Sequence, residues 1–321
     1  MSKAKATPTW QEQAKVVCTQ TERPILVGPF RQEFGFEVLY WIPFVRWARD
    51  TYHVKPERLV VATRGGAGVF YRVTTGVELY RLRTLKEIRV GNALDWMANA
   101  SLKQREVTPF DRELIRGAEY DLRQEFALFP PALMFQAFNE VWGGRAPQQL
   151  LYEYMKLSKL PVPPLPETIT LPEAPFTAVK LYSRATLPHT GHMHHWSRKL
   201  VRRLCERGPV VSLEPPDITD DHASFMLPDH PNLTRIREAI TLDESLAIQG
   251  AVIGRAKQFV GTYGGMQQLA LLQGIPSVGF YSKWEGTLPA HLECSQHIAR
   301  SADQAFYVLK VGDEDRLKGV L

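Results

Sequence analysis

The stretch QFVGTYGGMQQLALLQGIPSVGFY, residues 258–281, decides the fold of this chain, because it follows the order strand, glycine turn, helix and strand with almost no spare residues. Gln258–Thr262 is short and mostly apolar, which predicts a buried strand. Gly264 and Gly265 permit a tight turn, and Met266–Gln273 predicts one short helix, which a further glycine ends before the next apolar run. The stretch therefore predicts a βαβ unit.

The glycine turn of this unit has the geometry of a phosphate site. The first free N–H groups of the helix point out of the carboxyl edge of a parallel sheet, where the helix dipole and the unsatisfied donors favour an anion. A tight turn that binds nothing would also explain the two glycines. The surrounding sequence has to decide between these two interpretations.

The composition is that of a globular protein without a membrane span. The chain has 321 residues, of which 44% are hydrophobic and 23% charged, and this length suits two domains of about 150 residues each. No apolar run reaches the roughly 18 residues of a spanning helix. Met1–Lys5 is basic but has no apolar core behind it, so we expect no secretory signal. Cys18, Cys205 and Cys294 are far apart, which favours reduced thiols in the cytoplasm and no structural zinc site.

The net charge of +5 is unevenly distributed along the chain. Residues 1–165 hold 23 Lys and Arg against 17 Asp and Glu, a surplus of +6, whereas the remaining residues hold 16 against 17. A basic first half suits an acidic partner, which could be a nucleic acid, a phosphorylated glycan carrier or a phospholipid surface. A basic face that is merely solvated is the alternative.

A proline-rich segment divides the sequence. Residues 160–175 contain six of the 23 prolines, so neither a helix nor a central strand can run through them, and we place a domain boundary between 165 and 166. In the first half we expect an irregular arm, strands at 24–30 and 58–63, and helices at 37–52, 110–126, 132–142 and 148–157. In the second half we expect strands at 178–182 and 209–213 and helices at 195–207, 242–256 and 303–311. This alternation predicts α/β domains with doubly wound parallel sheets, whose ligands bind outside the carboxyl ends of the strands.

Three side chains follow the first expected strand of the second half. Lys180, Tyr182 and Arg184 fall at the ligand edge of the sheet, where the two cations could clamp phosphoryl oxygens. A strand end that is basic only because it is exposed is the alternative. The nearby stretch 189–195 holds four of the nine histidines on what we interpret as one loop, without a carboxylate or cysteine at ligand spacing, so we expect no metal there.

Two carboxylates follow the first strand of the chain. Glu33 and Glu37 lie among glycine and aromatic residues, where desolvation raises the pKa of a carboxyl group and prepares it as a general base. Glu37 could instead be an acidic residue in the first turn of a helix. Arg64, beside Gly65 and Gly66 at the end of the second strand, could meet an acidic ligand, or this turn could bind nothing.

Several enzyme classes are disfavoured by missing motifs. The chain has no Gly-x-x-x-x-Gly-Lys-Ser/Thr loop and no Gly-x-Gly-x-x-Gly after its first strand, which argues against a P-loop nucleotide triphosphatase and a dinucleotide dehydrogenase. It also lacks the Gly-x-Ser-x-Gly nucleophile turn of the α/β hydrolases.

Three pieces of the second half occur in a fixed order: ESLAIQ at 244–249, AKQFVGTYGG at 256–265 and GIPSV at 274–278. This order of a helix, a strand ending in Val-Gly-x-x-Gly-Gly, a short helix and Gly-x-Pro resembles the donor-binding block of GT-B glycosyltransferases, in particular heptosyltransferase-like and fucosyltransferase-like enzymes. The rest of the chain agrees with them only in layout. The resemblance implies two Rossmann-like domains facing each other across a cleft, with the acceptor on residues 1–165 and a nucleotide-sugar on residues 166–321.

The resemblance also implies roles for individual residues. The enzyme would be a nucleotide-sugar-dependent glycosyltransferase that uses no cofactor and no metal. Glu33 is the expected base, Glu37 the second choice, and Arg64 the expected acceptor-side contact. The expected contacts to the diphosphate and the sugar are Lys180, Tyr182, Arg184, Tyr263, Gly264, Gly265, Met266, Gln267 and Gln268.

Other features stay open at this stage. The chain departs from the heptosyltransferase pattern at Thr262 and Tyr263, where an acidic residue is common, so the resemblance does not imply which sugar is used. The stereochemical outcome, the acceptor and the oligomeric state are not implied either. The alternatives are a phage-type DNA glycosyltransferase that acts on hydroxymethylated bases, a sugar-nucleotide epimerase and a non-catalytic nucleotide-binding protein.

Overall fold

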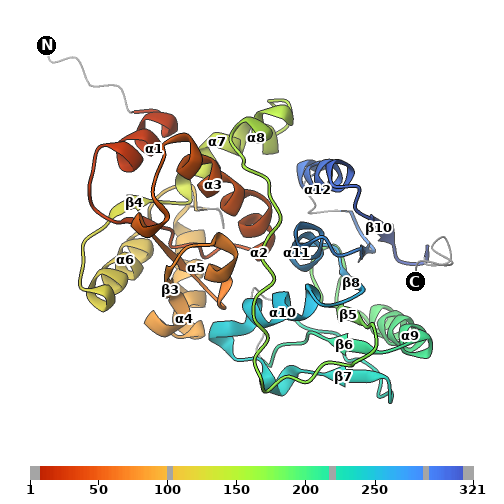
Figure 1. The fold of residues 1–321 in the computed structure, drawn as a ribbon. Helices are drawn as coiled ribbons and strands as arrows, with labels where there is room; N and C mark the ends of the chain where they lie inside the picture. Colours follow the sequence, from red (N-terminus) through yellow and green to blue (C-terminus); the bar gives the residue numbers. More distant parts are fainter. Residues whose placement is uncertain (1–7, 100–103, 217–221, 285–288, 314–321) are drawn as a thin grey trace, which may run out of the picture. The chain divides into compact units, whose positions relative to one another are not determined.

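The computed structural model describes residues 8–99, 104–216, 222–284 and 289–313, and their contacts form two compact units (Figure 1). The first unit contains the described residues up to Gln32 together with Tyr40–Leu157. The second unit contains Glu33–Leu39 and the described residues from Ser158 onward. A short segment from the N-terminal half of the sequence therefore belongs, by its contacts, to the second unit.

The first unit is built on a four-stranded parallel sheet with helices on both faces. Its order from edge to edge is β3 (Thr75–Glu78), β2 (Leu59–Thr63), β1 (Ile25–Val27) and β4 (Ala127–Phe129). One face packs its apolar side chains against α5 (Leu85–Asn99) and α6 (Pro109–Leu122). The opposite face carries an aromatic cluster that joins β4 to α1 (Trp10–Thr19), α3 (Ile42–Thr51) and α7 (Ala132–Trp142).

Shorter elements connect these layers. They are the 3-10 turns Pro56–Arg58 and Ala67–Tyr71, the helices α4 (Leu79–Leu82) and α8 (Gln149–Glu153), and the π-helical turn Glu37–Trp41, which precedes α3. The π-helical turn directly follows α2 (Phe34–Phe36), the short helix that belongs to the second unit.

The second unit is built on a six-stranded parallel sheet. Its order is β10 (Phe306–Lys310), β9 (Ser277–Tyr281), β8 (Gln258–Thr262), β5 (Thr177–Lys180), β6 (Val210–Ser212) and β7 (Leu233–Arg235). Read from β7, the chain order is 3-2-1-4-5-6, which is the strand order of the Rossmann sheet, and the first unit follows the same order through its fourth strand. The order reverses between β5 and β8, and this is where such sheets bind ligands.

Helices cover both faces of the second sheet. Trp196 and Leu200 of α9 (Gly191–Arg207) pack on the face that carries Val179 and Val260. On the other face, Gly279 leaves room for Gln267 of α11 (Gly265–Gln273), because a Cβ atom at Gly279 would lie 1.8 Å from the Gln267 Oε1 atom. The remaining helices of this unit are α10 (Ser245–Ile253) and α12 (Pro289–Ser301), with 3-10 turns at Arg237–Ala239 and Leu242–Glu244.

The predicted α/β class is confirmed, and the βαβ unit at 258–281 appears as β8, α11 and β9. The helix predicted at 303–311 is wrong, because Phe306–Lys310 is strand β10, paired in parallel with β9. Its aromatic and β-branched residues favour a strand once an edge is open for pairing.

Two other expectations about local structure are corrected. The arm before the first strand is not irregular, because it contains α1, which begins with a capping box formed by Thr9 and Glu12. The histidine run is not one loop, because α9 begins at Gly191 with Thr190 as its cap, so only the first of the four histidines precedes the helix.

Candidate functional site

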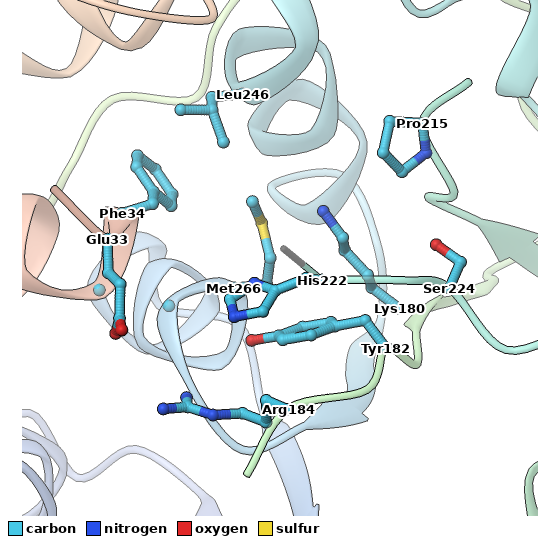
Figure 2. Close-up of a pocket in the computed structure, with 12 residues that line it drawn as sticks. Glu33, Phe34, Lys180, Tyr182, Arg184, Pro215, His222, Ser224, Leu246 and Met266 are labelled. Carbon is cyan, nitrogen blue, oxygen red and sulfur yellow. The ribbon is translucent and has the colours of Figure 1, made fainter. Parts of the chain in front are cut away.

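The candidate site is a pocket of the second unit at the point where the strand order reverses. It is lined by residues that follow β5, β6 and β8, together with part of α2. Figure 2 shows Glu33 and Phe34 opposite Lys180, Tyr182 and Ser224. About 540 Å³ of space lies among these residues, a figure that includes solvent at the open side of the pocket.

The last residue of β5 and the segment that follows it supply the basic side chains of the pocket. Lys180 is buried and donates a hydrogen bond to the Gln249 side chain of α10, and its Nζ atom lies 5.8 Å from the centroid of the Tyr182 ring. The Thr262 hydroxyl accepts a hydrogen bond from the Tyr182 N–H (2.9 Å) and donates one to the Tyr182 carbonyl (2.8 Å). This pair of bonds fixes the end of β5 against the end of β8, so that Arg184 comes to lie beside the glycine turn.

The glycine turn is enclosed by side chains on one side and by backbone on the other. A Cβ atom at Gly264 would lie 2.7 Å from the Tyr182 hydroxyl and 2.8 Å from the Arg184 Nη1 atom. A Cβ atom at Gly265 would lie 2.7 Å from the backbone nitrogen of Gly35 in α2. Since α11 begins at Gly265, its first N–H groups have no acceptor within the helix and emerge beside these side chains.

Ionisable side chains give the pocket a positive balance. Lys180 and Arg184 are the two basic side chains, the His222 ring packs at a tilt on Tyr182 with ring centroids 4.6 Å apart, and Glu33 supplies the carboxylate. A helix N-terminus together with two cations is an arrangement that binds anions, in particular phosphoryl oxygens.

Of the other predicted site residues, Met266 lines the pocket, whereas Gln267 lies against β10, where its Nε2 atom donates to the Tyr307 carbonyl at 2.8 Å. Gln268 is buried beside Gly35. Tyr263 is also buried, stacks on Trp284 with ring centroids 6.1 Å apart, and burial raises the pKa of its phenol, so the hydroxyl stays neutral.

The two predicted carboxylates of the first half lie in different environments. Glu33 is exposed at the mouth of the pocket, so the expectation that its surroundings desolvate it is wrong, whereas Glu37 is fully buried in the π-helical turn and does not line the pocket. Both belong by their contacts to the second unit, although we expected them on the acceptor side.

Arg64 lies in the first unit and is buried. Its Nη2 atom donates to the Gln32 carbonyl at 2.6 Å, and its Nη1 atom lies 3.4 Å from the Tyr80 hydroxyl. The N–H groups of Gly65 and Gly66 donate to the Glu78 carboxylate at 3.0 and 2.8 Å. A carboxylate of the protein therefore occupies the position that an anionic ligand would take at this turn.

Sequence reasoning missed His222 and Ser224. These residues reach the pocket because residues 222–225 run antiparallel to the end of β5: the Ser183 N–H donates to the Ala223 carbonyl and the Phe225 N–H to the Leu181 carbonyl. No local signal marks this pairing. Among the residues that the structure describes, no group of three or more His, Cys, Asp or Glu side chains is placed to hold a metal ion.

Comparison with known proteins gives structural likenesses only. No protein-family model and no curated protein sequence matches the chain. A glycosyl transferase family 9 protein from Veillonella parvula is 12% identical with a TM-score of 0.47, covering 94% of this chain and 90% of its own. The E. coli ADP-heptose lps heptosyltransferase II is 11% identical with a TM-score of 0.46, covering 83% and 87%, and the E. coli heptosyltransferase WaaC with ADP is 14% identical with a TM-score of 0.44, covering 89% and 92%. We rest no argument on likenesses at this level and argue the function from the pocket itself.

Proposed function

We propose that this protein is a glycosyltransferase that moves a sugar from a nucleotide-activated donor to the hydroxyl group of an acceptor. The observation that carries the proposal is the meeting, in one pocket at the reversal point of a Rossmann sheet, of the α11 N-terminus, Lys180, Arg184 and the Glu33 carboxylate. This set contains what the reaction needs: donors and cations for a diphosphate, and a base near its sugar end.

The proposed donor binds with its diphosphate against Gly264, Gly265 and Met266, where Lys180 and Arg184 neutralise its charge. Diphosphate binding by side chains and a helix terminus needs no divalent ion, so we propose that the reaction is metal-independent. As the leaving group departs, the developing charge on its oxygen is stabilised by the same donors, which lie in fixed positions before the reaction begins.

Glu33 acts as the general base in this mechanism. The acceptor oxygen forms a bond to the anomeric carbon, the bond between that carbon and the phosphate oxygen breaks, and its electron pair leaves with the diphosphate. The proton of the acceptor hydroxyl passes to the Glu33 carboxylate. The exposure of Glu33 at the mouth of the pocket supports this role, because an acceptor can reach it from solvent.

A thermal-shift screen of nucleoside diphosphates and nucleotide sugars tests the proposal, since a ligand that binds the folded state raises its melting temperature. We expect at least one of them to stabilise the protein. The stabilising nucleotide sugar is then incubated with candidate acceptors, and Glu33→Gln is expected to lower turnover by about 10²–10⁴-fold while leaving the thermal shift in place. If other ligands stabilise the protein but no nucleotide does, the proposal is wrong.

A further inference from the structure

Helix α5 of the first unit turns polar side chains toward the protein. Its Asn92 and Asp95 side chains accept hydrogen bonds from the buried guanidinium of Arg31, and the Arg31 Nη2 atom lies 2.6 Å from an Asp95 oxygen. Ile88 is the buried apolar side chain of this face, and Gly91 lies against the Phe110 ring. The inner face of α5 is therefore held by Ile88 in the apolar core and, one to two turns later, by hydrogen bonds and an ion pair.

The large apolar side chains of α5 face solvent instead. The exposed fractions are 51% for Val90, 56% for Leu94, 52% for Trp96 and 65% for Met97. Val90, Leu94 and Met97 follow the i, i+4, i+7 spacing of a single helix face. Single exposed apolar residues are ordinary, but an apolar stripe on the outer face of a helix that turns Asn92 and Asp95 toward the protein departs from the usual pattern and marks an interaction surface.

Basic side chains accompany the stripe. Lys86 lies 11 residues before Met97 and so falls within about 20° of it around the helix axis, at 100° per residue. Arg89 is exposed and lies one position before Val90. Before α5 begins, Arg81 lies in α4 and Arg83 directly follows the last residue of α4. Glu87 is the acidic residue on this outer side, and its carboxylate is engaged by the N–H and hydroxyl of Thr84 at 2.7 Å.

We propose that α5 is a docking helix for an anionic membrane surface, into whose headgroup region Val90, Leu94 and Met97 insert. An interfacial helix combines an apolar stripe with Lys and Arg, as this face of α5 does. The 15 residues of α5 are too few to cross a bilayer, and among the described residues no helix is long and apolar enough to do so. The stripe belongs to the first unit and shares no residue with the pocket, so this proposal does not depend on sugar transfer.

The charge on this face separates the membrane from two other partners. A second copy of the chain, docked by the same face with the two α5 helices parallel, would bring Lys86 and Arg89 close to their own equivalents, which repel them. A nucleic acid would use the basic residues but would leave the apolar stripe without a contact. An anionic bilayer uses both features at once.

Sedimentation of the full chain with lipid vesicles tests the proposal. The probes are vesicles of phosphatidylcholine alone and vesicles that also contain phosphatidylserine. We expect binding to the anionic vesicles, weakening with salt, and a loss of roughly tenfold or more in Leu94→Asp and in Met97→Asp. Met226→Asp is the matched control, because Met226 is 72% exposed in the second unit, and it is expected to bind as the wild type does.

Three results would overturn the proposal. One is that the anionic vesicles do not bind the wild type, and another is that they bind Leu94→Asp as well as Met226→Asp. The third is that the α5 variants change the dimerisation constant or retention on duplex DNA and leave vesicle binding unchanged. An unaltered unfolding transition in each variant shows that a loss of binding reflects the surface.

Discussion

The contact between Gly35 and Gly265 gives an asymmetric prediction for two otherwise similar substitutions. A Cβ atom at Gly265 would lie 2.7 Å from the Gly35 nitrogen, 3.1 Å from the Gly35 Cα atom and 3.3 Å from the Phe34 carbonyl carbon, so it would press on three consecutive backbone atoms. A Cβ atom at Gly35 would be closest, at 2.7 Å, to the Oε1 atom of Gln268, the end of a flexible side chain. Among the described residues this oxygen has no hydrogen-bond partner, so it can turn aside without losing a bond.

We therefore expect Gly265→Ala to cost about 1–3 kcal/mol of unfolding free energy, as overpacking of a dense interior does. Gly35→Ala should cost less than about 1 kcal/mol, because a rotamer change relieves its main clash. Gly117→Ala is the control. Gly117 lies within α6, and a Cβ atom there would make ordinary contact, at 3.5 Å, with a methyl group of Leu82. We expect this variant to gain about 0.5–1 kcal/mol of unfolding free energy, because alanine favours a helix more than glycine does.

Urea unfolding of the three variants measures these differences, with the melting temperature as a second readout at roughly 2–4 °C for each kcal/mol. Because the chain has two units, the transition of the second unit has to be followed separately. The reasoning is refuted if Gly265→Ala is as stable as the wild type, or if Gly35→Ala costs as much as Gly265→Ala.

Two further predictions concern buried charges. Burial raises the pKa of the Glu214 carboxyl above its ordinary 4.5, against the opposing effect of Arg235 and Arg237. A carboxyl group with a raised pKa stabilises the fold at pH values below its ordinary pKa, and this contribution is lost as the pH rises through the folded-state pKa. Glu214→Gln should therefore be more stable than the wild type at pH 7, and the difference in unfolding free energy should shrink toward pH 4. Urea midpoints that differ equally at both pH values would contradict this. Arg31→Met should lower the free energy of unfolding by about 3–5 kcal/mol, measured by urea titration, because it leaves Asp111 buried without its cation. A loss below about 1 kcal/mol would show that the ion pair does not hold α5 and α6 in place.

The parts of the fold that the sequence predicts well are local. In 258–281 the glycine turn, the helix length and the following strand are all specified by neighbouring residues, and they appear as β8, α11 and β9. The strand β10 was predicted as a helix, because its short apolar run fits either structure until pairing with β9 selects one. Helix α5 escaped prediction for a related reason: its polar residues face inward only because Arg31, which is distant in the sequence, binds them.

The candidate site was predictable only in part. Lys180, Tyr182 and Arg184 could be placed beside the glycine turn, because the ends of parallel strands share one edge. Gly35 and Gly265 are 230 positions apart in the sequence, and their backbones lie in contact because neither residue has a side chain. A contact of this kind produces no pattern in the sequence near either glycine. His222 likewise enters the pocket through a backbone pairing that its own sequence does not indicate.

Calorimetric titration with nucleoside diphosphates tests most directly the claim that the pocket of the second unit binds a nucleotide-activated donor. Arg184→Gln removes one pocket cation, and Arg203→Gln removes an exposed cation of α9 as the matched control. We expect at least one nucleoside diphosphate to bind the wild type and the Arg203 variant equally, and to bind the Arg184 variant about 10–100-fold more weakly, the loss expected for a charge-assisted hydrogen bond. Equal binding by both variants, or no binding of any nucleoside diphosphate to the wild type, would contradict the account.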